Sequence, residues 1–139
     1  MRILGIITNI SDFLKAEDHL KIFVKPFNPI KIHNFFYRLL CGETNNKKYK
    51  QEQSKLWSDF FYQSTNYTEK GVKLNPLTEI LGAMASQGII ESSPTKLSKI
   101  LFSNRGEKDI KTLRSYIQAG KKNSVLADWI KEIISTIKM

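Results

Sequence analysis

Three dipeptides in this chain place a proline directly after a residue whose side chain can cap a helix. They are Asn28-Pro29, Asn75-Pro76 and Ser93-Pro94. The capping side chain accepts a hydrogen bond from a free amide of the first turn, and the proline that follows has no amide to satisfy. Each dipeptide therefore predicts the start of a helix. Three such starts in 139 residues constrain the chain to fold mainly from helices.

Apolar side chains after each start recur at the spacing of one helical face. The spacing predicts a helix from Pro29 to about Cys41, and Gly42 suits the left-handed residue that follows a helix. It also predicts a helix from Asn75-Pro76 to a stop at Gly88.

A stripe of large apolar residues at helical spacing predicts another helix, over residues 51–63. Large aromatic side chains are usually buried, so the stripe is interpreted as core and not as a platform on which bases stack. Residues 42–50 before it are polar and predict a loop, and residues 64–73 after it are interpreted as a surface segment. The stripe consists of Leu56, Trp57, Phe60 and Phe61.

The two ends of the chain carry weaker patterns. Residues 3–10 are rich in β-branched side chains, which favours a short N-terminal strand, but the run is too short for periodicity to exclude a helix. Ser11 then caps a helix that Pro26 ends. Asp109 and Ser124 are predicted to cap the last two helices.

Length and composition fit one compact, all-α domain over residues 1–139, with about six helices. A subdivision into parts 1–50 and 51–139 stays open. The single cysteine cannot form an internal disulfide, and no apolar stretch approaches the roughly 20 residues of a membrane-spanning helix. The short apolar run after Arg2 lacks a following cleavage site for a signal peptide. We therefore expect a cytoplasmic protein without a membrane partner.

Positive charge is concentrated in residues 93–122. The chain has a formal net charge of +9, which favours polyanionic partners such as nucleic acid. This segment holds eight basic and two acidic residues, so six of the nine net charges fall within it. The rest of the chain is close to balanced.

The same segment has the pattern of two short helices across a joint at Asn104-Arg105-Gly106, as in a helix-turn-helix. In that motif the second helix lies in the major groove of duplex DNA, and the first braces it. Arg and Gln can bond base edges, whereas lysines mainly neutralise phosphates. The predicted outward residues of the second helix are Lys111, Thr112, Arg114, Ser115 and Gln118; the predicted phosphate contacts are Lys96, Lys99, Lys108, Lys121 and Lys122, and Arg105 completes the predicted DNA-binding set.

Other interpretations stay open. The lysines of residues 93–122 also fit an ordinary solvated surface. The aromatic helix over 51–63 also fits a protein-interaction module with no nucleic-acid role, and a homodimer or a protein partner remains open. An enzyme is not supported, because the chain has no glycine-rich phosphate cradle, nucleophile elbow or His-Glu zinc motif. His19, His33 and Cys41 are too few for a zinc site, so we expect no metal, cofactor or catalytic residue; His33 is interpreted as a core-edge residue and Cys41 as a small buried one.

A longer pattern covers about residues 77–134. It begins with LTEILGAMASQGII, continues through KLSKILF and DIKTLRSYI, and ends with GKKNSVLADWIKEII. This pattern resembles the C-terminal part of the RteC-like regulators from conjugative tetracycline-resistance elements of gut anaerobes. The resemblance implies a helical regulator, similar in its C-terminal part to DNA-binding domains, that acts on transcription of mobile-element genes. The chain departs from these regulators in its unmatched N-terminal half and in having fewer arginines in the GKKNS segment.

Overall fold

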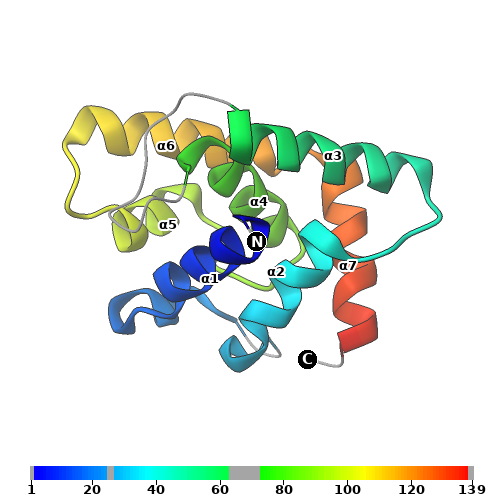
Figure 1. The fold of residues 1–139 in the computed structure, drawn as a ribbon. Coiled ribbons are helices and arrows are strands. Elements are labelled where there is room, and N and C mark those ends of the chain that lie inside the picture. Colours follow the sequence, from blue (N-terminus) through cyan, green and yellow to red (C-terminus); the bar gives the residue numbers. More distant parts are fainter. Residues whose placement is uncertain (1, 25–26, 63–72, 138–139) are drawn as a thin grey trace.

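The computed structural model describes residues 2–24, 27–62 and 73–137, and this part of the chain is all-α (Figure 1). Its buried side chains form one cluster to which every α-helix contributes. The elements in chain order are α1 (Arg2–Lys15), the 3-10 helices η1 (Glu17–Ile22) and η2 (Pro29–Lys31), α2 (Ile32–Cys41), α3 (Lys47–Tyr62), α4 (Leu74–Ser86), α5 (Pro94–Leu101), α6 (Glu107–Gly120) and α7 (Ser124–Ile137).

Helix α4 is the centre of the packing (Figure 1). From Pro76 to Ala85 its residues are buried, with Glu79 as the half-buried exception. A helix that is apolar on all sides belongs inside a fold, and α4 accordingly packs against α3, α6 and α7. Its one buried hydroxyl, that of Thr78, donates to the carbonyl oxygen of Leu74 at 2.8 Å, so no polar group of this side chain is left unpaired.

Helices α4 and α6 cross at two glycines. A Cβ on Gly82 would overlap the carbonyl oxygen of Ile117, and a Cβ on Gly120 would lie 2.5 Å from the carbonyl oxygen of Glu79. Only glycine lets the two backbones approach this closely. The crossing therefore fixes how α6 is placed on the molecule.

The N-terminal residues form a helix, so the predicted strand over 3–10 is wrong. Ile3, Ile7, Ile10 and Leu14 are all buried and recur at the spacing of one helical face. Packing of this face against the core overrides the strand preference of the β-branched side chains. Ser11 lies inside α1 and caps nothing; the next helical segment is η1.

Two predicted caps are confirmed. The Asn28 side chain accepts a hydrogen bond from the amide of Ile30 at 3.0 Å, and the Ser93 hydroxyl accepts one from the amide of Lys96 at 3.3 Å. In both places the proline follows the cap at the start of the helix. The sequence predicts these caps because both hydrogen-bond partners are local.

Other predicted boundaries shift. Helix α4 begins at Leu74, so Asn75-Pro76 lies in its first turn. Gly42 has extended backbone angles, φ −68° and ψ 144°, and not left-handed ones. Gly88 does adopt the left-handed conformation, with φ 75°, two residues after the end of α4. Helix α3 starts at Lys47, within the predicted loop, because the Asn46 side chain accepts hydrogen bonds from the first amides of that helix.

The last two predicted caps are also corrected. Helix α6 begins at Glu107, so Asp109 lies in its first turn and caps nothing. Asn123 and not Ser124 caps α7, through a hydrogen bond from the amide of Leu126 at 3.1 Å. The surface segment predicted over 64–73 falls almost wholly outside the described residues.

None of the described helices combines the length and the apolar character that crossing a membrane requires.

Candidate nucleic-acid interface

The joint between α5 and α6 is anchored in the core. Phe102 is 1% exposed, and its ring stacks on that of Phe13 of α1 at a centroid distance of 6.0 Å. Beyond it, the guanidinium of Arg105 donates to the carboxylate of Asp109 at 3.0 Å. This ion pair engages Arg105 within the joint and joins the turn to the start of α6.

Helix α6 has one buried face and one exposed face. Leu113 and Ile117 are buried and Ile110 is half-buried, which confirms the predicted inward residues. The outer face carries exposed polar and basic side chains from four of the predicted positions, Lys108, Lys111, Ser115 and Gln118. Lys122 is exposed in the turn that follows α6.

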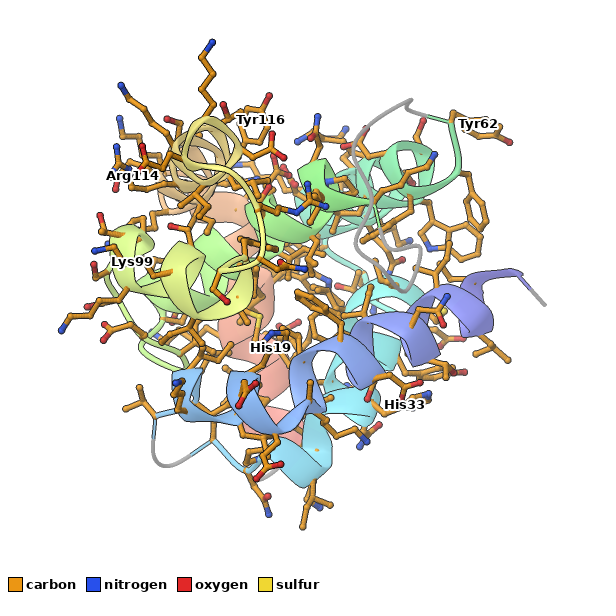
Figure 2. The ribbon with its side chains drawn as sticks, turned by 90° about the vertical axis from the view of Figure 1, so that its left-hand side faces the viewer. His19, His33, Tyr62, Lys99, Arg114 and Tyr116 are labelled. Carbon is orange, nitrogen blue, oxygen red and sulfur yellow. The ribbon has the colours of Figure 1, made fainter. Side chains whose placement is uncertain are left out.

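Arg114 lies between the two faces. It is half-buried and lines a hollow of about 310 Å³ between the start of α5 and the middle of α6. Figure 2 shows Arg114 of α6 and Lys99 of α5 on the same side of the molecule, with Tyr116 on the opposite side of α6. The hollow is lined by Pro94, Thr95, Arg114, Ser115 and Gln118.

Several predicted residues are engaged in local interactions. The ammonium of Lys96 lies 3.8 Å from the carboxylate of Glu91. A hydrogen bond from the Ser93 amide and the charge of Lys96 lower the pKa of Glu91. The ammonium of Lys121 donates to the carbonyl oxygen of Ser92 at 2.9 Å and so ties the end of α6 to the segment before α5.

Thr112 lies at the edge of the exposed face of α6, next to Lys108. Its hydroxyl donates to the carbonyl oxygen of Lys108 at 3.0 Å. Residues four apart share one side of a helix, so Thr112 lies between Lys108 and Tyr116 and away from Arg114. Among the predicted residues of α6, Arg114 thus faces α5, and Thr112 lies on the side of the helix away from it.

Five of the predicted basic residues have no carboxylate partner in the described part of the chain. Within the ranges that the structure describes, Lys99, Lys108, Lys111, Arg114 and Lys122 form no ion pair with a carboxylate. On α3, by contrast, the ammonium of Lys55 is paired with the carboxylate of Glu79 at 2.9 Å, and the carboxylate of Asp59 lies nearby. Burial raises the pKa of Asp59. The five unpaired cations named above thus lie on α5, on α6 and in the turn after α6.

The remaining polar candidates are His19, His33 and Cys41. No group of three or more His, Cys, Asp or Glu side chains able to hold a metal occurs among the described residues. His33 is exposed, so its interpretation as a core-edge residue is wrong. The ring of His19 contacts Phe13 and bonds its carbonyl oxygen at 2.6 Å. Cys41 is half-buried, and burial raises the pKa of its thiol.

A larger hollow lies elsewhere, beside α3. Its volume is about 940 Å³, and Trp57, Phe61 and Tyr62 of α3 line it together with residues of α1 and α2. The indole N–H of Trp57 donates to the carbonyl oxygen of Leu40, and this hydrogen bond holds the Trp57 side chain against α2. The aromatic stripe is therefore only partly core: Leu56 and Phe60 are buried, and Trp57 and Phe61 border the hollow.

Comparison with known proteins finds no match to a family model, a curated protein or a solved structure. The resemblance to the RteC-like regulators and the helix-turn-helix arrangement accordingly stay predictions.

Proposed function

We propose that this protein is a non-enzymatic DNA-binding accessory protein or transcriptional regulator, cytoplasmic, whose α5–α6 surface contacts duplex DNA. The observation that supports it most is the two-sided character of α6. Its inner face is held against α4 by the Gly82–Gly120 crossing, its outer face presents Lys108 and Lys111 to solvent, and Lys122 is exposed in the turn that follows.

The dimensions suit this role. Helix α6 has 14 residues and is about 21 Å long. The major groove is about 12 Å wide and admits one helix. In this arrangement the lysines neutralise phosphates, and Gln118, whose amide can bond a base edge bidentately, contacts a base. The resemblance to the RteC-like regulators favours genes of a mobile element as the target.

The test is a titration of a mixed-sequence duplex by fluorescence anisotropy across a range of salt concentrations. Replacing Lys108, Lys111 and Lys122 together by alanine is expected to weaken binding and to reduce the slope of log affinity against log salt by about 2.7, or about 0.9 for each lost phosphate contact. The control replaces Lys15, Lys21 and Lys131, which are exposed on other elements and change the net charge equally. Equal effects of the two triple variants, or no binding at low salt, contradict the proposal.

A protein-interaction module is the second candidate, because Tyr62 is 83% exposed at the edge of the hollow beside α3. Under this function the chain binds no mixed-sequence duplex, even at low salt. It associates with itself or with a protein through α3, and in the case of a homodimer Tyr62→Ser shifts sedimentation toward the monomer. Duplex binding that is insensitive to Tyr62→Ser favours the first function.

A further inference from the structure

The hollow between α5 and α6 is built from hydrogen-bond donors. Three of its five lining residues, Thr95, Arg114 and Gln118, carry a side chain that can donate to a ligand, and none of the five is acidic. The guanidinium of Arg114 has five N–H groups in a planar fork that matches phosphate or carboxylate oxygens. The site therefore has the chemistry of an anion pocket.

Arg114 lacks the counter-charge that a half-buried cation normally has. Within the described residues no carboxylate pairs with its guanidinium. The nearest acidic residue before α5 in the sequence, Glu91, is already engaged by the Ser93 amide at 3.1 Å and by Lys96 at 3.8 Å. A partly desolvated guanidinium with no carboxylate is stabilised when an anion binds it.

The walls of the hollow are held in place before any ligand arrives. The Ser93 hydroxyl caps α5, and the Lys121 ammonium bonds the Ser92 carbonyl oxygen at 2.9 Å, so α6 and the start of α5 are linked. The Ser115 hydroxyl is fixed at 3.2 Å from the carbonyl oxygen of Lys111. Groups that are ordered in the free protein lose little freedom on binding, which favours affinity.

We propose that this hollow is a phosphate clamp in which Arg114 binds one backbone phosphate of the duplex. The inference deepens the proposed function and rests on it for the source of the phosphate. It also changes the role that the sequence gives Arg114, from bonding a base edge to positioning the duplex. The base contact then falls to Gln118, and Arg114 sets the register in which it meets the groove.

The first arm of the test needs no DNA. Inorganic phosphate is titrated into the free protein and followed by two-dimensional NMR of its amide and arginine N–H signals, with chloride at equal ionic strength as the reference. Saturable shifts at Thr95, Arg114 and Ser115, lost in Arg114→Gln, support the clamp. Lys111→Gln removes the same charge one turn away and is expected to leave these shifts in place. Shifts that are equal in chloride, or that persist in Arg114→Gln, overturn it.

The second arm measures the affinity of two duplexes of different sequence. Arg114→Gln is expected to weaken both by the same factor, about tenfold for a charge-assisted hydrogen bond, and to lower the salt slope by about 0.9. Arg114→Lys keeps the charge without the fork and is expected to restore the slope but only part of the affinity. A loss confined to one sequence identifies a base contact and overturns the clamp.

The two proposals fail in different ways. If the wild-type protein binds no duplex but the phosphate shifts are present, the DNA-binding function fails and the clamp stands as an anion site. If the duplex binds and Arg114→Gln has no effect while the variant keeps the wild-type unfolding temperature, the clamp fails and the function stands.

Discussion

Replacing Gly82 by alanine tests the crossing of α4 and α6 on which the orientation of the candidate interface depends. The new Cβ would overlap the carbonyl oxygen of Ile117 and lie 2.6 Å from the amide nitrogen of Lys121. Both obstacles are backbone atoms, which cannot rotate away as a side chain does. The two helices therefore have to move apart, and the α6 surface moves with them.

The magnitude follows from two opposing effects. An extra methyl group in a filled helix contact costs about 1–3 kcal/mol, and the backbone obstacles place this substitution at the upper end. Alanine is more favourable than glycine inside a helix by about 1 kcal/mol, which offsets part of this cost. We expect the free energy of unfolding to fall by about 2 kcal/mol. For 139 residues, with an unfolding entropy of about 2.1 cal/mol/K per residue, this lowers the Tm by about 7 °C.

Thermal unfolding followed by far-UV circular dichroism measures the effect. Gly5→Ala is the matched control, because Gly5 lies inside α1 with no atom within 4 Å of its added Cβ. There the propensity gain stands alone, and the Tm is expected to rise by about 3 °C. If Gly82→Ala is as stable as Gly5→Ala, the close crossing is wrong, and with it the assignment of the outer face of α6.

Three further outcomes follow from single side chains. The Ser93 amide and nearby charge lower the pKa of Glu91 below its ordinary 4.5, so its stabilisation is present above that pH and is lost as pH falls. Glu91→Gln should therefore lower the Tm at neutral pH, with a difference that shrinks in acid. Trp129→Phe, which removes the indole bond to the Leu39 carbonyl oxygen, should cost about 1–2 kcal/mol in urea unfolding, since a second donor still bonds that oxygen. Burial raises the pKa of the Cys41 thiol, so alkylation at pH near 8 should be slower than that of free cysteine.

The sequence predicts the start of a helix well where the capping side chain and the amide that it binds are close together in the sequence. The Asn28 and Ser93 caps hold because each side chain bonds an amide two or three residues later. The predicted inward residues of α6 are confirmed because the helical period alone places Leu113 on the inner face and Lys111 on the outer face. The all-α class follows from adding such signals along the chain.

The errors arise mainly where partners distant in sequence decide the outcome. Residues 3–10 have a strand-like composition, and only the surface against which Ile3 and Ile7 pack makes them a helix. The start of α3 is different, because its signal is local. Asn46 lies in a polar stretch that is typical of a loop, although asparagine is also a favoured cap.

The candidate site shows the same division. The period of α6 is enough to identify Lys111, Ser115 and Gln118 as outward residues. It cannot identify the hollow around Arg114, because one wall of that hollow belongs to the start of α5 and the distance between the helices is not encoded in either alone. Nor does it show that Lys121 bonds the Ser92 carbonyl oxygen.

The two glycines of the crossing connect the stability of the fold to the proposed function. Successive residues of a helix point about 100° apart, so turning α6 by one position would bring Arg114 toward α4 in place of Leu113. A buried, unpaired guanidinium costs several kcal/mol, whereas Leu113 is 2% exposed and apolar. The close contact of Gly82 and Gly120 adds a second constraint, since at other rotations a side chain would have to enter the gap. The same packing that stabilises α6 therefore keeps its cations outside, and a variant that loosens the crossing should weaken duplex binding even though it removes no charge.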